Sequence, residues 1–484
     1  MENSFKNKTI SGLIWTFLDN FVVKGISFAT NIFLAKLLSP EDFGLIGMVT
    51  IFIAIANTLI DAGLTSSLIR SQDIDNDDYS TVFITNIISS FILYVLLFAC
   101  APWIASFYNI SVLIDILRMY GLIFILSSLY AVQVTILIKR LDFKKITIYN
   151  IPGVVIGAIV GVMGGYYGYG VWSLVYSYLS IQIVNILIFW TLSDWKPSLV
   201  FSRKKFKKHF DFGYKLLLTG ILGNIFNNIY NIVIGKFFPL RSLGFFDRAN
   251  TFSQYPSTVL IMMIGKVSFP ILAEYQNDIN QLKIKFKQFI TYSVFVISFI
   301  MISISFWGDI FFIKILGNEW SVAATYFSIF CYAGIFLPLH SLNTNTLKIM
   351  GRTDLILKME IIMKIAISIV VFIAYFKGIQ ALVISVLINA VILFLLNIYF
   401  AAKVIPYSFF EQLKDVTKIL CLSLSLFASY YFFRMIIPNM NLSYSYMLLL
   451  TFFNLFLFLF VAKLLRFTQT DDLFDIVKSK MIKK

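Results

Sequence analysis

Charged residues are scarce in this chain of 484 residues, at 13% of the sequence against 59% for hydrophobic residues. Soluble globular domains carry about 25% charged residues, so the composition excludes an ordinary soluble domain. Apolar runs such as 82–101, 286–307 and 446–462 approach the ~20 residues that cross a hydrocarbon core as a helix. The composition therefore predicts many membrane-spanning helices.

Cysteine and histidine are also rare. Cys100, Cys331 and Cys421 stand singly within apolar runs, as buried small hydrophobic residues do. The two histidines, His209 and His340, cannot form a metal site by themselves. The sequence has no phosphate-binding loop, zinc-protease motif or dinucleotide fingerprint. We therefore expect no metal, no cofactor and no nucleotide-driven step, which leaves H+ or Na+ coupling or a downhill gradient to drive any transport.

The apolar segments predict an all-α polytopic membrane protein with about fourteen transmembrane helices. With a cytoplasmic N-terminus, most of the 40 Lys and Arg residues fall on the cytoplasmic side, as the positive-inside rule requires. The even helix count then places both termini in the cytoplasm. The net charge of +15 is expected to face anionic lipid headgroups, not nucleic acid. The predicted helices are 11–34, 44–64, 80–102, 112–136, 146–164, 169–192, 214–234, 251–272, 287–308, 319–341, 358–376, 379–402, 417–436 and 443–465.

A weak internal repeat divides the chain. Residues 31–36 read NIFLAK and are followed by Gly44, while residues 231–236 read NIVIGK and are followed by Gly244. Each half would contain an even number of helices, so the repeats are predicted to be parallel, about an axis along the membrane normal. We expect pseudo-symmetric six-helix lobes at 1–200 and 201–405, and a helix pair with a basic cytoplasmic tail at 406–484. Two such lobes around a cavity suit alternating access.

The predicted fifth helix has a face of small residues. Gly153, Gly157, Gly161 and Gly165 recur every four residues. Small residues at this spacing let two helix backbones approach closely in a membrane. We interpret this face as architecture and not as a ligand site.

Two lysines stand inside apolar helices: Lys24 in the first and Lys266 in the eighth. A charge at the centre of a membrane helix costs about 2.5–3.5 kcal/mol on insertion scales, so such residues usually face the protein interior or a wet cavity. We expect both lysines to line a cavity and to bind an anionic group of a substrate.

Amide side chains follow the same pattern. Asn31 shares a helix face with Lys24, and Asn224, Asn228 and Asn231 recur on the first helix of the second predicted lobe. Two interpretations remain open: these side chains bind substrate in a cavity, or they only bond neighbouring helices. We retain all four as candidate substrate-binding residues.

The other intramembrane charges come in close pairs. Asp115 and Arg118 are three residues apart, and Glu360 and Lys364 are four apart, so each pair can neutralise itself on one helix face. Arg118 is expected near the outer mouth and Lys364 toward the inner one. Either cation is also a candidate for contact with substrate.

Two acidic residues lack such a pairing. Asp19 precedes Lys24 by five residues, which is not an ideal helix-face spacing, and Asp61 ends the second predicted helix. An intramembrane carboxylate is a candidate proton or sodium site. We therefore nominate Asp19 and Asp61 for ion coupling, with a gate-lining role for Asp61 as the alternative.

Several motifs resemble those of a known transporter family. They are LLSPEDFG at 37–44, DAGL at 61–64, GYGVWSLV at 168–175, LGFFDRA at 243–249 and the Phe269-Pro270 pair. Their order and spacing resemble the polysaccharide exporters, or Wzx-type O-antigen flippases (lipopolysaccharide biosynthesis proteins). These belong to the multidrug/oligosaccharidyl-lipid/polysaccharide (MOP) superfamily. The pattern is closest to the teichuronic and colanic acid exporter branch and covers the whole chain.

The resemblance implies a V-shaped, two-lobe transporter in the bacterial inner membrane. Its implied substrate is an undecaprenyl-diphosphate-linked oligosaccharide, moved from the cytoplasmic to the outer leaflet for O-antigen or exopolysaccharide biosynthesis. Related flippases hold the diphosphate with cations, and Lys24 and Lys266 lie in the helices where such cations are expected. The implied partners are the lipid-linked substrate and membrane lipids. Work beside a polymerase and a chain-length regulator is left open.

Two other functions were weighed. A cation-coupled multidrug exporter of the same superfamily would favour acidic residues in its cavity, whereas the mid-helix charges here are mostly basic. A membrane glycan polymerase or ligase would need a large outer loop or a catalytic constellation, and the sequence predicts neither. We therefore expect a transporter and not an enzyme.

Overall fold

The chain is folded into helices in the computed structural model, and no strand occurs among the residues that the model describes. These are residues 2–61, 63–436, 444–467 and 469–470, without the side chains at 2–14, 16–20, 215, 434, 436, 444 and 446. The chain forms two compact units, Met1–Asp247 and Arg248–Lys484. The all-α fold expected from the sequence is confirmed.

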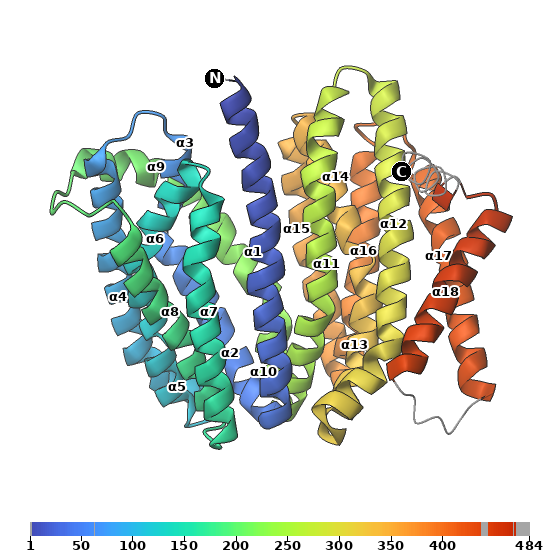
Figure 1. The fold of residues 1–484 in the computed structure, drawn as a ribbon, viewed down its shortest axis with the longest axis horizontal. Coiled ribbons are helices and arrows are strands. Elements are labelled where there is room, and N and C mark those ends of the chain that lie inside the picture. The colour runs from blue at the N-terminus through green and yellow to red at the C-terminus, as the bar shows by residue number, and fades with distance from the viewer. Residues whose placement is uncertain (1, 62, 437–443, 468, 471–484) are drawn as a thin grey trace. The chain divides into compact units, whose positions relative to one another are not determined.

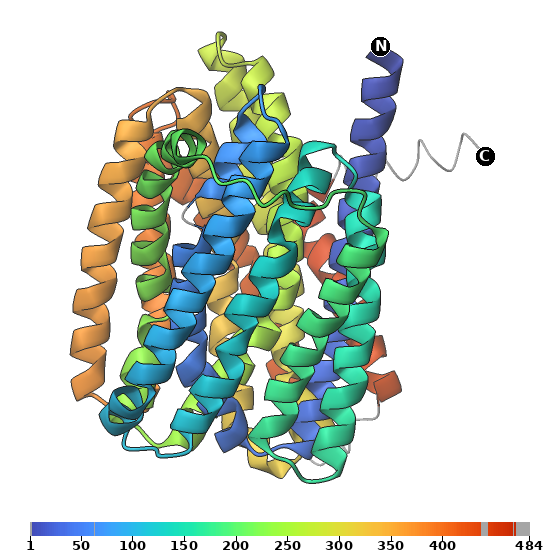
Figure 2. The ribbon, with the colours of Figure 1, turned by 90° about the vertical axis from the view of Figure 1, so that its left-hand side faces the viewer.

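The first unit is a bundle of long apolar helices joined by short connections (Figure 1). Within it, α4, α6, α8 and α7 run side by side (Figure 2). Two predicted helices are each divided: α5 meets α6 at Gly121, and α9 meets α10 at Asn228. The elements are α1 (Glu2–Leu37), α2 (Pro40–Asp61), α3 (Leu64–Arg70), α4 (Asn76–Tyr108), α5 (Leu113–Tyr120), α6 (Leu122–Lys139), α7 (Phe143–Tyr166), α8 (Val171–Leu192), α9 (Arg203–Asn227), α10 (Ile229–Phe237) and the start of α11 (Leu240–Glu274).

Helix ends in this unit follow from local chemistry. The Asp75 carboxylate accepts hydrogen bonds from the backbone N–H groups of Asp77 and Asp78, and the Asp78 carboxylate accepts one from the Asp75 N–H. This reciprocal capping box starts α4. Asn109, at φ 58°, ends it in the left-handed conformation that asparagine tolerates. These caps extend α4 at both ends beyond the predicted 80–102.

The glycine face of α7 packs closely, as the sequence predicts. A Cβ added to Gly157 would lie 2.9 Å from the Ser177 carbonyl oxygen, and one on Gly161 would lie 3.0 Å from the Ser177 Cβ. The Ser177 hydroxyl donates to the Gly157 carbonyl across the same contact at 2.7 Å. Side chains larger than hydrogen would therefore push α7 away from α8.

The start of α2 and the start of α11 make a reciprocal contact. A Cβ on Gly44 would lie 2.5 Å from the Leu240 carbonyl oxygen, and a Cβ on Gly244 would lie closer still to the carbonyl of Pro40. Pro40 and Leu240 occupy equivalent repeat positions, as do Gly44 and Gly244. Residue i of one repeat thus meets residue j of the other and the reverse, which is the pattern of a two-fold contact.

The first unit extends beyond residue 200, the predicted end of the N-terminal lobe. It does so because α9 packs against α2, α3 and α4, and α10 packs against α2. The division of the chain into two pseudo-symmetric six-helix lobes stays a prediction.

The second unit contains the rest of α11 and the helices after it. The predicted helix at 319–341 is divided at 335–336 into α13 and α14, and α14 continues to Ile349. The elements are α12 (Ile279–Asp309), a π-helical turn (Ile310–Leu316), a 3-10 turn (Asn318–Trp320), α13 (Ser321–Gly334), α14 (Leu337–Ile349), α15 (Thr353–Phe376), α16 (Ile379–Ala401), α17 (Phe409–Ile436) and α18 (Tyr444–Leu464).

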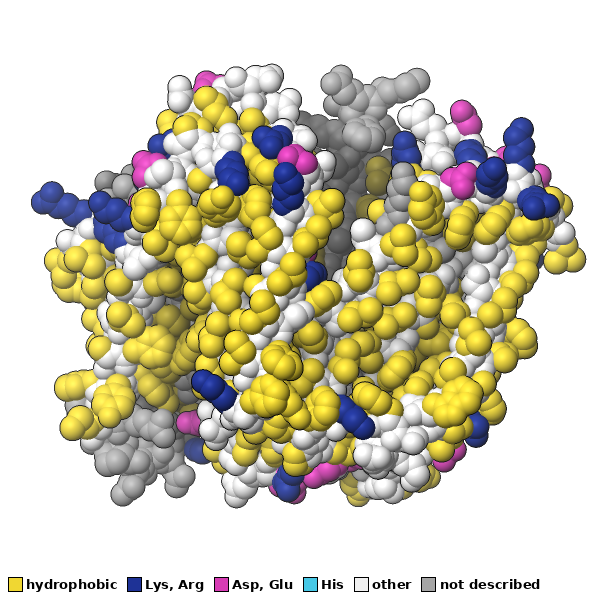
Figure 3. Space-filling model, turned by 180° about the vertical axis from the view of Figure 1, so that it is seen from behind, with side chains coloured by type: hydrophobic (Ala, Val, Ile, Leu, Met, Phe, Trp, Pro, Cys, Tyr) yellow, Lys and Arg dark blue, Asp and Glu magenta, His cyan; other side chains and the backbone are white. Residues whose placement is uncertain are grey.

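Many helices of both units suit a membrane. Within the described ranges, 11 helices are long and apolar enough to cross one, or up to 12 if the bent pair of α9 and α10 is a single span. Large apolar side chains are exposed along them, including Phe91, Trp103 and Phe452. On the face in Figure 3, hydrophobic side chains cover most of the helix surfaces, and charged side chains gather mainly toward the helix ends. The count of fourteen and the cytoplasmic placement of both termini stay predictions.

Candidate functional site

Lys24 lies half-buried on α1. Two other polar residues of its stripe turn back onto their own helix. The Ser27 hydroxyl donates to the Val23 carbonyl, and the Asn31 amide donates to the Ser27 carbonyl, both at 2.8 Å. Across the part of the chain with described side chains, no hydrogen bond or ion pair involves the Lys24 ammonium. The described side chains thus provide no counter-ion for this half-buried ammonium.

The predicted asparagine stripe lies on α9 and α10 and contacts α2. The Asn224 amide donates to the Thr58 hydroxyl at 2.7 Å and to the Ala54 carbonyl at 3.1 Å. The Asn231 amide donates to the Gly47 carbonyl at 3.4 Å. In this structure both side chains bond a neighbouring helix, which is one of the two interpretations left open by the sequence.

Asn228 lies at a break in a candidate span. The axes of 216–227 and 229–237 differ by 46°, and Asn228 is the residue between them. Its side-chain amide donates to the Asn224 carbonyl at 2.9 Å, and the same carbonyl accepts the Asn228 backbone N–H at 3.1 Å. Broken membrane helices are tolerated where polar groups or a wet cavity satisfy the freed backbone, and they recur at transporter binding sites.

Arg118 and Asp115 do not form the predicted ion pair. Asp115 is exposed, while the Arg118 guanidinium lies over the Phe98 ring, 4.1 Å from its centroid. No salt bridge joins the two residues, both of which are described in full. Stacking on an aromatic face replaces the carboxylate because the guanidinium is weakly hydrated and planar.

Asp61 has a structural contact. Its carboxylate accepts a hydrogen bond from the Thr65 backbone N–H at 3.1 Å, at the start of α3. An acidic side chain is favoured at a helix N-terminus because it satisfies a free N–H and complements the helix dipole. Asp19, the other nominated carboxylate, lies on α1, but its side chain falls outside the described residues.

Lys266 is exposed on α11 in the second unit. None of the described residues forms a hydrogen bond or ion pair with its ammonium. Its helix α11 is one of the candidate spans found among the described residues.

A small cavity of about 190 Å³ lies among α11, α13, α14, α15 and α16 of the second unit. Its polar lining consists of amides and hydroxyls: Asn250, Ser253, Gln254, Ser257 and Asn389. The Gln254 amide donates to the Asn250 side-chain oxygen at 3.0 Å. An uncharged lining of this kind suits hydroxyl-bearing groups better than an ion.

Lys364 forms the predicted pair with Glu360, with 3.8 Å between the ammonium and the carboxylate. His340 of α14 joins this pair: its Nε2 lies 3.9 Å from the other Glu360 oxygen. The His340 Nδ1 lies 3.2 Å from the side-chain oxygen of Asn397 on α16. Three helices thus meet at one titratable cluster.

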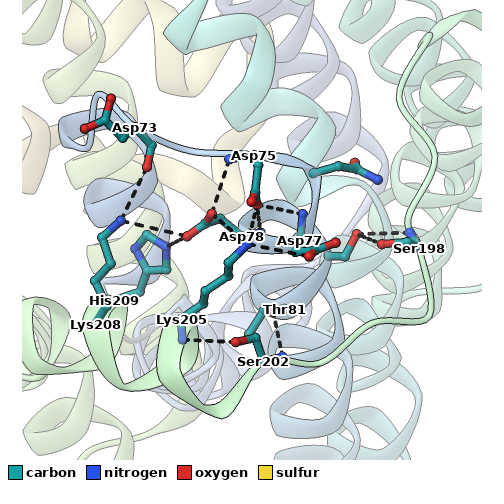
Figure 4. A network of polar contacts seen from close by, with 12 residues as sticks. Asp73, Asp75, Asp77, Asp78, Thr81, Ser198, Ser202, Lys205, Lys208 and His209 are labelled. Atoms are coloured by element: carbon teal, nitrogen blue, oxygen red, sulfur yellow. Dashed lines mark hydrogen bonds and ion pairs between the residues drawn. The ribbon is translucent and has the colours of Figure 1, made fainter.

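A charge network joins the start of α9 to the start of α4 (Figure 4). The Lys205 ammonium pairs with Asp75 and lies 3.4 Å from Asp78 and 3.6 Å from Asp77. The hydrogen bond from Lys205 holds the pKa of Asp75 well below its usual value, and Asp75 in turn raises the pKa of Lys205. The network fixes the N-terminal end of α9 to the segment that precedes α4.

His209 is fully buried beside Asp78 at one side of this network (Figure 4). Its Nε2 lies 2.9 Å from the Asp78 carboxylate and its Nδ1 lies 2.8 Å from the Ser67 hydroxyl. A neutral ring with the proton on Nε2 satisfies both contacts, because Nδ1 then accepts from the hydroxyl. Ser67 is only 4% exposed, so a substrate cannot reach this serine-histidine-aspartate arrangement. The contact therefore stabilises the fold.

Two of these features were missed by the sequence analysis. The connection expected over 193–213 is helical from Arg203 onward, because the Ser202 hydroxyl caps α9. His209 and His340 were considered only as potential metal ligands. The His340 contact with Glu360 joins two helices, so no spacing in the sequence indicates it. Ser202 could have been recognised, because serine is favoured at the N-cap of a helix.

The polysaccharide biosynthesis protein family matches residues 33–325 of the chain. The teichuronic acid biosynthesis protein TuaB of Bacillus subtilis is 24% identical over 355 residues, which are 73% of each chain. The lipopolysaccharide biosynthesis protein WzxC of Escherichia coli is 22% identical over 361 residues, 74% of this chain and 73% of WzxC.

Solved structures show the same fold. The lipid II flippase MurJ, in an inward closed conformation, is 16% identical with a TM-score of 0.74, covering 94% of this chain and 98% of MurJ. A multidrug resistance MATE family transporter of the MOP superfamily, in an inward-facing conformation, is 15% identical with a TM-score of 0.59, covering 84% and 98%. The chain therefore belongs to the polysaccharide biosynthesis protein family, and it is a multi-pass protein of the inner membrane.

Proposed function

We propose that this protein is a flippase for an undecaprenyl-diphosphate-linked oligosaccharide. It moves this substrate from the cytoplasmic to the outer leaflet by alternating access, and it catalyses no covalent step. Its family and its polysaccharide-related relatives support a lipid-linked glycan as the substrate class. The glycan belongs to O-antigen or exopolysaccharide biosynthesis, and a polymerase and a chain-length regulator are the expected neighbours.

The observation that carries this proposal is Lys24. An ammonium group inside an apolar helix costs free energy unless an anion compensates it, and the described side chains supply none. A lipid-linked diphosphate brings multiple negative charges to membrane depth, where a weakly screened lysine attracts them strongly. Lys266 is likewise proposed to bind an anionic group of the substrate.

The remaining nominated residues have lesser roles in the proposal. Asn31, Asn224, Asn228 and Asn231 supply amides for sugar hydroxyls in conformations where their helix contacts open. Arg118 and Lys364 are proposed as additional cations that contact the substrate, Arg118 near the outer mouth of the cavity and Lys364 toward the inner one. Asp19 and Asp61 are proposed to couple transport to H+ or Na+, with both chain termini in the cytoplasm.

A cation-coupled multidrug exporter is the second candidate, supported by the fold shared with the MATE family transporter. Lys24 and Lys266 weigh against it, because a basic site repels the cationic compounds that such exporters carry. The uncharged lining of the cavity in the second unit gives such compounds no counter-ion.

Flipping in proteoliposomes tests the proposal. The substrate is a fluorescent undecaprenyl-diphosphate oligosaccharide, and the readout is its exposure to a membrane-impermeant quencher. The chain is compared with Lys24→Ala, Lys266→Ala and the double variant. Lys145→Ala is the matched control, because Lys145 is a surface lysine 3.8 Å from Asp142 at the start of α7.

A diphosphate site predicts that flipping falls at least about tenfold in the double variant, since one lost charge contact of about 1.4 kcal/mol already gives that factor. Lys145→Ala should flip at the native rate. Native rates in a correctly inserted double variant would remove both lysines from the mechanism. Export of cationic dyes by a native protein that flips no lipid would establish the exporter instead.

A further inference from the structure

His340 is held between three helices of the second unit. Its side chain is 30% exposed, and its two ring nitrogens face different partners. Nδ1 lies 3.2 Å from the Asn397 side-chain oxygen on α16, and Nε2 lies 3.9 Å from a Glu360 carboxylate oxygen on α15.

The orientation of Asn397 decides the tautomer of His340. The Asn397 side-chain nitrogen donates to the Leu393 carbonyl at 2.7 Å, and a flipped amide would place two acceptor oxygens against each other. The Asn397 oxygen therefore faces Nδ1, which must donate. In a neutral imidazole the lone pair then lies on Nε2, facing the Glu360 carboxylate.

We propose that His340 and Glu360 form a proton-binding site that takes up one proton between Nε2 and the carboxylate. Without this proton, a lone pair faces a carboxylate oxygen and the contact is repulsive. With it, the contact is either an imidazolium–carboxylate pair or a neutral histidine beside a carboxylic acid. Proton uptake changes the charge of the His340–Glu360–Lys364 cluster from zero to plus one.

The surrounding charges favour a proton over a metal ion. The groups that act electrostatically on His340 are Glu360 and Lys364 on α15 and Lys348 on its own helix, α14. Lys364 already places an ammonium 3.8 Å from Glu360, so a second cation there would be repelled. No group of three potential metal-ligating side chains exists in the described portion of the chain. A proton needs only the one nitrogen and the one oxygen.

The site lies beside the cavity in the second unit, so proton binding there can change the shape of that cavity. That cavity is lined by Leu337 of α14, Met363 of α15 and Leu393 of α16, which lie about one helical turn from His340, Glu360 and Asn397, respectively. A proton that draws Nε2 toward Glu360 from 3.9 Å pulls α14 toward α15 beside the cavity. This coupling rests on the proposed transport function, whereas proton binding itself does not.

Histidine NMR tests proton binding directly, because the chain has only two histidines. The full chain in lipid nanodiscs, labelled at the imidazole, is titrated between about pH 5 and pH 9. His340→Gln assigns the remaining signal to His209. The site predicts that Glu360→Gln lowers the His340 titration midpoint and that Lys364→Met raises it, each by about one unit. The His209 signal is the internal control and should stay unchanged in both variants.

A His340 signal that does not titrate in this range, or that moves in neither variant, overturns the proposal. Transport then tests the coupling: native flipping should accelerate under an imposed pH gradient, and Glu360→Gln should remove the acceleration. A native chain that titrates as expected but flips nothing would contradict the proposed function and leave the proton site standing. A chain that flips substrate normally but whose His340 signal does not titrate would support the proposed function and contradict the proton site.

Discussion

Replacement of His209 should destabilise the first unit more than any exposed substitution near it. His209 is fully buried and connects Ser67 of α3, Asp78 of α4 and its own helix α9. His209→Ala removes both hydrogen bonds and leaves the buried Asp78 carboxylate with one partner fewer. An apolar void replaces the ring at the same time.

The magnitude follows from what remains beside Asp78. Removal of one partner from a buried charge pair costs about 3–5 kcal/mol when nothing else compensates. Here the Lys205 ammonium remains 3.4 Å away and the Asp75 backbone N–H still donates, so the loss is smaller. We expect about 2–3 kcal/mol, including about 1 kcal/mol for the Ser67 contact.

Thermal unfolding in detergent, followed by the helical circular dichroism signal, measures this loss. A fall in the melting temperature of about 4–10 °C is expected for His209→Ala. His209→Gln is the matched variant: its amide can donate to Asp78 without the Ser67 contact, so its melting temperature should fall less. Hydrogen exchange should localise the change to α3 and the first turns of α4 and α9. Melting of His209→Ala within a degree of the native protein would refute the reasoning.

Three further predictions concern contacts in the same unit. Gly244→Ala should prevent stable folding, because its Cβ would collide with the Pro40 carbonyl. The yield of monodisperse protein measures this effect. Gly223→Ala is the control and should express normally, because the space at its Cβ is open. Lys205 lowers the pKa of Asp75 in the folded protein, so this pair stabilises the fold above about pH 4, and the stabilisation is lost as the pH falls. Lys205→Met should therefore flatten the decline of melting temperature between about pH 5 and pH 3. An unchanged slope would contradict this expectation. Asp61→Asn should retain the melting temperature, because its amide oxygen still accepts from Thr65, while Asp61→Ala should lose about 1 kcal/mol; equal loss in both would show that charge and not capping matters.

The positions of the helices could largely be predicted from the sequence, because long apolar segments need a helix in lipid to satisfy their backbone. Each predicted segment overlaps a helix or a divided helix of the structure. The errors lie at the ends. The α4 helix gains residues at both ends through the Asp75 capping box and the Asn109 cap, neither of which is apolar. Hydropathy detects the membrane-embedded part of a helix but not the polar turns that extend it.

The breaks inside helices were not predicted. The α9–α10 bend at Asn228 occurs without proline or glycine at that position, so the residue type there does not indicate a bend. Asn224 and Asn231 each bond α2, on either side of the break, and such contacts between helices leave no signal in the sequence. The glycine face of α7 could be predicted, because its four-residue spacing alone specifies a close helix contact.

Some contacts of the candidate site could also be predicted from the sequence, and others could not. The Glu360–Lys364 pair could be predicted because both residues lie on one helix, where spacing fixes proximity. The Asp115–Arg118 pair has a similar spacing and does not form, because a ring on α4 offers the guanidinium an alternative. His340 was missed because its partners come from two other helices. Contacts within a helix can be deduced from spacing, whereas contacts between helices need the fold.

The asparagine contacts change how mutations in this protein are to be interpreted. Loss of transport after Asn224→Ala would not identify a substrate contact, because the same change removes two hydrogen bonds that join α9 to α2. Hydrogen bonds between membrane helices average about 0.6 kcal/mol, enough to shift a balance between conformations without unfolding the protein. Lys24 carries no such ambiguity among the described contacts, since its removal breaks none of them. A transport defect at Lys24 would therefore support the proposed contact with the substrate, whereas a defect at Asn224 would report first on the helix pair.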